Sequence, residues 1–194
     1  MIRKILTMSA LGVGCVLVNG GVAQALTLTP TREEVMNQMD QWVQLREGLA
    51  SSLLGVDTTQ ITADTFQSVC APVGKSIQEW SKKTGLEAKQ WALKFRNPNN
   101  EPKGALRAWL RTFEKNPEHT HAVFSEKRGD QEGQLYLRRI SVTEGCLKCH
   151  GPKEQRPAFI QNKYPKDHAY GFKAGDLRGV LSVWLPTPGP QRNE

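Results

Sequence analysis

Apolar residues recur at helical spacing in the segment that follows Pro30. Their positions are Val35, Met39, Trp42, Leu49 and Leu53. Intervals of three, four and seven residues place side chains on one face of an α-helix. Thr31 and Glu34 form the sequence signature of a capping box at the start of that helix, and Gly55 is a stop signal. The pattern predicts a long amphipathic helix at the start of the folded part.

The next apolar stretch is predicted to be a helix that is interrupted near its middle. It begins near residues 62–64 and ends at Gly85. Its apolar positions are Phe66, Val69, Cys70, Val73 and Ile77. Proline lacks the N–H that a helix interior needs and glycine favours helix less than other residues, so Pro72 and Gly74 should kink or split this helix.

The second half of the chain is predicted to be mainly strands. They are expected over residues 91–95, 121–126, 134–142 and 178–185. A helix over residues 105–113, closed by Asn116 and Pro117, interrupts the series, and residues 128–133 join the middle two strands into a hairpin. Helices followed by antiparallel strands indicate an α+β fold. No internal repeat is visible.

The first 25 residues have the plan of a secretory signal peptide. Arg3 and Lys4 precede an apolar stretch over residues 5–18, and Ala23-Gln24-Ala25 is an A-x-A cleavage site. The stretch is short for a membrane span. A retained anchor and a lipoprotein site at Cys15 are alternatives. We expect residues 1–25 to be a cleaved signal, 26–186 one domain without a membrane span, and 187–194 a flexible tail.

Composition and charge exclude several classes of protein. A chain of 194 residues with 38% hydrophobic and 23% charged residues is neither disordered nor collagen-like, and four cysteines are too few for a disulfide-built scaffold. Cleavage after Ala25 would remove two of the 26 basic residues and none of the 19 acidic ones, which lowers the formal charge from +7 to +5. The remaining basic residues are scattered, so nucleic-acid binding is not expected.

One motif carries recognisable chemistry. Cys146-Leu147-Lys148-Cys149-His150 is C-x-x-C-H, the attachment sequence for c-type haem. In this motif two thiols form thioethers with the two vinyl groups of one porphyrin, and the following imidazole is the proximal iron ligand. A redox-active cysteine pair would require a thioredoxin-like βαβ context, and a zinc site would require a second cysteine pair; the sequence offers neither. The motif therefore predicts one covalently bound haem c.

The second axial ligand of that haem is left open by spacing alone. The candidates are Met36, Met39, Cys70, His119, His121 and His168. Met39 fits the apolar stripe of the first helix, and the histidines lie in polar segments. Cys70 differs from these, because removal of Cys15 and use of Cys146 and Cys149 would leave it without a disulfide partner. It is either a buried thiol or an iron ligand.

Several segments resemble a family of exported, single-haem c-type domains with a PAS-like fold. The matching segments are Phe95–Pro102, Cys146–Pro152, Tyr164–Phe172 and Gly175–Val183, and the helix with Cys70 resembles the family's cysteine-bearing helix. Members include small cyanobacterial cytochrome-like proteins and extracytoplasmic sensor domains of bacteria. The resemblance implies a PAS-like antiparallel sheet with a long N-terminal helix and flanking helices over residues 26–186. It also implies one haem with His150 as proximal and Cys70 as distal axial ligand.

The sequence and the resemblance together predict a non-enzymatic haem protein of the periplasm or the thylakoid lumen. A His/Cys ligand pair favours a low-potential redox or gas sensor, which takes a small gas ligand in the reduced state. Because no output domain follows Glu194, we expect a separate redox or signalling protein as partner. The alternative is a soluble electron-transfer cytochrome. A peroxidase-like enzyme would need acid–base groups such as His168 or Arg139 at an open distal site, and no motif supports one.

Overall fold

The computed structural model describes residues 29–54 and 61–188. The predicted signal peptide, Gly55 and residues 189–194 of the predicted tail lie outside the described residues. Within the described part, no helix is long and apolar enough to cross a membrane.

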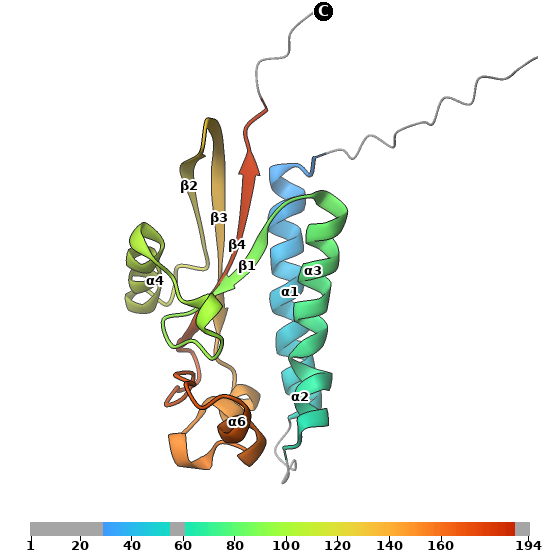
Figure 1. Ribbon diagram of the computed structural model, residues 1–194, viewed down its shortest axis with the longest axis vertical. Coiled ribbons are helices and arrows are strands. Elements are labelled where there is room, and N and C mark those ends of the chain that lie inside the picture. The colour runs from blue at the N-terminus through green and yellow to red at the C-terminus, as the bar shows by residue number, and fades with distance from the viewer. Residues whose placement is uncertain (1–28, 55–60, 189–194) are drawn as a thin grey trace, which may run out of the picture.

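A four-stranded antiparallel sheet forms the middle layer of the molecule (Figure 1). Its order is β1 (Ala88–Trp91), β4 (Leu177–Pro186), β3 (Gln131–Ser141) and β2 (His121–Arg128). The helices α1 (Arg32–Leu53) and α3 (Ala71–Thr84) pack on one face, and α4 (Gly104–Lys115) packs on the other. Helices first and an antiparallel sheet afterwards confirm the predicted α+β fold.

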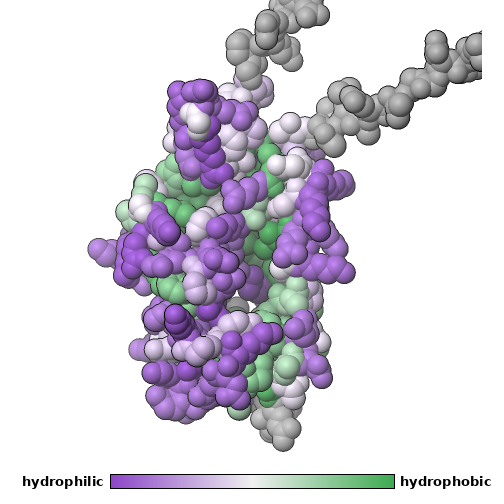
Figure 2. All heavy atoms as spheres, viewed as in Figure 1, coloured by the Kyte–Doolittle hydropathy of each residue, from purple (hydrophilic) through white to green (hydrophobic). Residues whose placement is uncertain are grey.

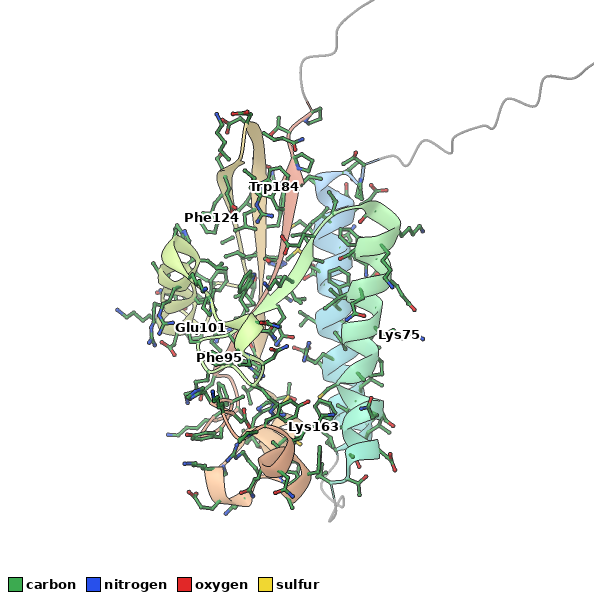
Figure 3. The ribbon with its side chains drawn as sticks, viewed as in Figure 1. Lys75, Phe95, Glu101, Phe124, Lys163 and Trp184 are labelled. Atoms are coloured by element: carbon green, nitrogen blue, oxygen red, sulfur yellow. The ribbon has the colours of Figure 1, made fainter. Side chains whose placement is uncertain are left out.

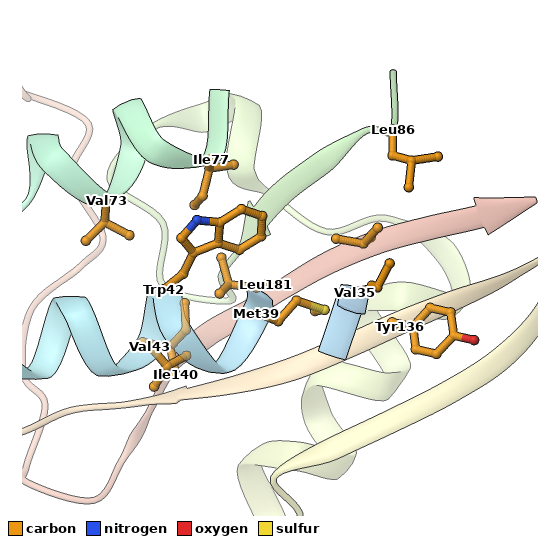
Figure 4. Close-up of a cluster of buried hydrophobic side chains, with 11 residues drawn as sticks. Val35, Met39, Trp42, Val43, Val73, Ile77, Leu86, Tyr136, Ile140 and Leu181 are labelled. Atoms are coloured by element: carbon orange, nitrogen blue, oxygen red, sulfur yellow. The ribbon is translucent and has the colours of Figure 1, made fainter. Parts of the chain in front are cut away.

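The core between the long helices and the sheet is apolar throughout (Figure 4). The first half of α1 contributes Val35, Met39 and Trp42, each no more than 1% exposed. The predicted capping box is present: Thr31 accepts from the N–H of Glu34, and the Glu34 carboxylate accepts from the N–H of Thr31. The N-terminal pattern therefore predicted this helix and the first half of its buried face correctly, whereas Leu53 of the predicted stripe is exposed.

The second predicted helix is split, as expected, but at Cys70. The helix α2 (Ala63–Val69) ends there and α3 begins, so that Cys70 caps one helix and precedes the other. Pro72 lies in the first turn of α3, where its missing N–H would have had no partner within the helix. Gly85 ends α3 with φ 71°, a conformation that favours glycine.

The first strand begins three residues earlier and ends four residues earlier than predicted. Residues 91–95 were expected to be strand, whereas β1 ends at Trp91, which pairs with Val180. The chain then turns, because the N–H of Ala92 donates to the carbonyl of Asn100 at 3.0 Å. The alternation over residues 91–95 therefore belongs to a bend. In contrast, the hairpin is longer than predicted, and its turn at Gly129 and Asp130 has Gly129 at φ 60°.

The segment between β3 and β4 forms a separate helical layer at one end of the sheet (Figure 1). Its elements are η2 (Glu144–Cys146), α5 (Leu147–His150), η3 (Lys153–Gln155) and α6 (Ala158–Lys163). Cys146 packs against Ala50, Leu54 and Val69, which come from the end of α1 and from α2. The C-x-x-C-H segment is therefore placed beside the junction of α2 and α3.

Candidate haem site

The two motif cysteines lie on one continuous helical stretch. Cys146 ends η2 and Cys149 lies in α5, so the two residues are spaced by about one helical turn. Cys149 is buried, and its burial raises the pKa of the thiol to about 11. Cys146 is half-buried and lies 3.2 Å from the Thr143 hydroxyl. Both cysteines line one cavity, which is also lined by Cys70 and His150.

A backbone hydrogen bond sets the tautomer of His150. The Nδ1 atom lies 2.7 Å from the carbonyl oxygen of Ala169. Because a carbonyl oxygen only accepts, Nδ1 carries the proton and Nε2 keeps a free lone pair. Burial, together with the positive charges of Arg178 and Arg96, holds the pKa of the imidazole well below its usual value. His150 is thus neutral and oriented as a metal-ligating histidine requires.

Cys70 and His150 line the same cavity although they are 80 residues apart. This cavity, of about 470 Å³, adjoins the one that the motif cysteines line, and Arg46 and Arg178 contribute to both. Figure 2 shows the surface hollowed where the motif segment meets α2 and α3. In Figure 3, Phe95 of the cavity wall lies between the sheet and this segment. The fold therefore brings all four predicted site residues together.

Three arginines give the cavity an excess of positive charge. They are Arg46, Arg96 and Arg178. The guanidinium of Arg96 donates to Asp167 at 3.3 Å and to the Cys149 carbonyl at 3.1 Å. Burial and the two other arginines lower the pKa of Arg178 to about 10. Asp167 is the only carboxylate with which any of these guanidinium groups forms an ion pair among the described residues.

Arg46 has a buried donor with no partner. Its Nη2 donates to Gln90 at 2.9 Å, but its Nε is buried and makes no hydrogen bond within the described part of the chain. A buried N–H without an acceptor is costly in a native protein. A bound anion would satisfy both this donor and the excess of positive charge.

These observations fit a haem. Its two propionates would be the anions that the arginines lack, its vinyl groups would meet the two thiols, and its iron would meet the free Nε2 of His150. Cys70 lies in the same cavity, and thiolate sulfur is a soft donor. The residues present therefore match the donors that the cofactor needs.

Comparison with known proteins identifies the family. The Tll0287-like family model matches residues 21–186. The chain belongs to the Tll0287-like family. It is similar to the solved structure of the cyanobacterial heme-protein Tll0287, with 45% sequence identity and a TM-score of 0.69; the match covers 82% of this chain and 98% of that one. No curated protein matches the sequence. Family and structure together support haem binding by this Tll0287-like chain.

The other candidate iron ligands lie elsewhere in this Tll0287-like fold. Met39 is fully buried in the core with Met36 packed beside it. His119 is exposed next to Glu118, and His121 contacts Asp40 at 3.0 Å. His168 is exposed and lies against Phe95 with 4.9 Å between ring centroids. None of these residues lines the cavity of Cys70 and His150.

Arg139, the other residue considered for an open distal site, has a structural position. The residue is 3% exposed, and its guanidinium donates to the carbonyls of Phe113 at 2.6 Å and Gly175 at 3.0 Å. It therefore ties α4 to the loop before β4.

Sequence reasoning missed the three arginines. Arg46 follows Trp42 by four residues and precedes Ala50 by four, so it lies on the buried face of α1, where a charge is unusual. This charged residue on a buried helix face was the sequence signal that could have identified Arg46 as part of the site. Arg96 and Arg178 lie inside the segments that carry the family resemblance, but their spacing alone indicates no function.

Proposed function

We propose that this protein holds one haem c and acts outside the cytoplasm, in the periplasm or thylakoid lumen, as a low-potential redox or gas sensor. In this proposal Cys146 and Cys149 form the two thioethers, His150 is the proximal ligand and Cys70 is the distal ligand. The fold is proposed to be PAS-like. The observation that carries the proposal is the shared cavity of Cys70 and His150 in a family whose solved member is a heme-protein.

The chain's own residues account for holding and orienting the cofactor. The Ala169 carbonyl keeps the His150 proton on Nδ1, which leaves Nε2 for the iron. The arginines supply the positive charge for the propionates. Bound in this way, the haem would supply a one-electron iron centre with a sixth position for a small gas.

Cys70 is the residue that distinguishes a sensor from a simple carrier. A thiolate at Cys70 would favour the oxidised state of the iron. Burial raises the pKa of the Cys70 thiol, and the positive charges of Arg46 and Arg96 act against that rise. When a separate donor protein supplies one electron to the holoprotein, Cys70 would take up a proton from water at Sγ and move away from the iron.

The position of Cys70 can convert that withdrawal into movement of a helix end. Its N–H donates to the Phe66 carbonyl at 2.9 Å at the junction of α2 and α3. A shift of Cys70 would displace this junction. A change of ligand would in this way favour one of two positions of the helices. A signalling partner would read the new position of the helices.

Replacement of Cys70 tests the proposal. The Cys70→Ser variant should have a markedly higher reduction potential and a changed ferric absorption spectrum, because the thiolate ligand is lost. The matched control is His119→Gln, which changes an exposed candidate ligand outside the cavity lining and should leave both quantities unaltered. An unchanged ferric spectrum in Cys70→Ser would show that Cys70 is not an iron ligand.

Carbon monoxide separates the sensor from the alternative, a soluble electron-transfer cytochrome. Rapid binding of carbon monoxide to the reduced holoprotein is expected if Cys70 withdraws. Absence of carbon monoxide binding would show that both axial ligands stay on the iron, as an electron carrier requires.

A further inference from the structure

Asp167 is a buried carboxylate to which the proposed ligation gives no role. Its side chain is 0% exposed. The Oδ2 atom accepts from Arg96 at 3.3 Å and from Arg156 at 2.8 Å, and the side chains of these two arginines are only 9% and 8% exposed. Because burial of charged groups is costly, such a cluster is weak evidence of stability by itself. The other oxygen of the carboxylate shows what the cluster holds in place.

That second oxygen fixes the position of Ala169. The Oδ1 atom of Asp167 accepts from the backbone N–H of Ala169 at 2.9 Å, and Ala169 is 0% exposed. The carbonyl of Ala169 lies 2.7 Å from Nδ1 of His150 and keeps the proton there. A single buried residue therefore connects the carboxylate to the imidazole, with its N–H bound on one side and its carbonyl on the other.

The chain around Ala169 runs beside the end of the C-x-x-C-H motif. The N–H of Gly171 donates to the Gly151 carbonyl at 2.6 Å, and the N–H of Phe172 donates to the His150 carbonyl at 3.1 Å. These two bonds hold the backbone at His150 and Gly151, whereas the Ala169 carbonyl holds the His150 ring. The position of that carbonyl therefore sets the direction in which Nε2 points.

The two arginines hold Asp167 from different parts of the site. Arg96 lines the cavity of Cys70 and donates through Nη2 to the carbonyl of Cys149 at 3.1 Å. Arg156 stands outside the lining of both cavities at the haem site. Two cations and one backbone N–H thus fix the carboxylate at three points. A group that orients a ligand has to be rigid in this way.

We propose that Asp167 is a positioning residue for the proximal ligand: through Ala169 it sets the orientation of the His150 imidazole and thereby the reduction potential of the haem. This inference rests on the proposed ligation by His150. An imidazole that donates from Nδ1 to a fixed acceptor is a stronger electron donor at Nε2, which favours the oxidised iron. Loss of the Asp167 carboxylate frees Ala169, weakens that donation and raises the potential.

The Asp167→Ala variant of the haem-loaded protein tests this role with two measurements. Redox titration gives the reduction potential. Electron paramagnetic resonance of the ferric protein gives the g values, which depend on the orientation of the imidazole plane at the iron. We expect a higher potential together with shifted g values, because the ring is no longer held in one orientation.

Asp176→Asn is the matched control. Asp176 is exposed, lies in the loop before β4, and also accepts from a backbone N–H, that of Lys173 at 2.7 Å. The control removes the same charge and the same kind of bond without touching Ala169, so its g values should equal those of the wild type. A shifted potential with unaltered g values in Asp167→Ala would show that Asp167 acts through its charge alone and would overturn the proposal.

A second variant decides the question if Asp167→Ala fails to fold. Asp167→Asn keeps the size of the side chain, but its one amide oxygen cannot serve both Ala169 and the two arginines. It should shift the g values in the same direction by a smaller amount, and unaltered g values would overturn the proposal. Haem staining separates the two hypotheses: a wild type without covalent haem contradicts both, whereas stained variants with unaltered g values contradict only the role of Asp167.

Discussion

The two halves of helix α1 face very different surroundings. The first half buries Val35, Met39 and Trp42 in a cluster that contains no charged group. The second half places Arg46 in the haem cavity, with a buried Nε that lacks an acceptor. The apolar cluster is formed by protein side chains alone, whereas the cavity contains a buried N–H without an acceptor and an excess of positive charge. The contrast shows that one helix serves two kinds of surroundings, a closed apolar core and a cavity with excess positive charge.

The largest expected effect concerns the haem attachment. The double variant Cys146→Ser, Cys149→Ser should lose covalent haem completely, because no thioether can form. Haem staining of a denaturing gel measures the attachment. Cys70→Ser is the control and should keep its stained band, since Cys70 is proposed as an iron ligand only. A stained band in the double variant would show that attachment occurs elsewhere.

The first half of α1, which packs in the apolar cluster, should be sensitive to loss of side-chain volume. Trp42 is 1% exposed, and its Nε1 donates to the Ser76 hydroxyl at 3.1 Å. Trp42→Ala should lower the free energy of unfolding by about 3–5 kcal/mol. Leu45→Ala on the exposed side of the same helix should change it by less than about 0.5 kcal/mol. Urea unfolding followed by circular dichroism measures both; equal losses would contradict the packing described.

A smaller effect is expected where α1 is tied to the edge of the sheet. The Asp40 carboxylate accepts from Arg138 and contacts His121. Burial acts to raise the pKa of Asp40, but these two partners outweigh it and hold the pKa below its usual value. Asp40→Asn should therefore lower the free energy of unfolding at pH 7 by about 1 kcal/mol.

The same group predicts a pH dependence. A depressed folded-state pKa stabilises the protein above the unfolded value, near pH 3.9, and this stabilisation is lost as pH falls through the folded value. The difference between wild type and Asp40→Asn should therefore shrink below about pH 4. Asp130→Asn, in the exposed hairpin turn, is the control. A difference that grows on acidification would exclude Asp40 as its source.

The smallest effect is expected in the second half of α1, which places Arg46 in the haem cavity. Removing the positive charge in Arg46→Leu should lower the reduction potential of the holoprotein by tens of millivolts, because a nearby cation favours the reduced iron. Lys82→Gln, on α3 outside the cavity lining, should leave the potential unchanged. An unchanged potential in Arg46→Leu would place the guanidinium of Arg46 away from the iron.

Local signals in the sequence were sufficient for most helices and for the haem motif. The capping box of Thr31 and Glu34 and the stop at Gly85 act over a few residues, so spacing reveals them. Strand β1 was misplaced because its ends are decided by pairing with β4, nearly 90 residues later. The alternation over residues 91–95 could not reveal the hydrogen bond that bends the chain at Ala92.

The sequence by itself determined the α+β class, the apolar face of α1 and the C-x-x-C-H motif, since each depends on residue types at short and regular intervals. Tertiary structure alone decided that Cys70 shares a cavity with His150 and that Arg46 and Arg178 enter the same site. These residues are brought together by packing of α1, α3 and the sheet. Contacts between distant segments produce no periodic pattern in the sequence. The motif could therefore be identified from the sequence, and the arrangement of the residues around it could not.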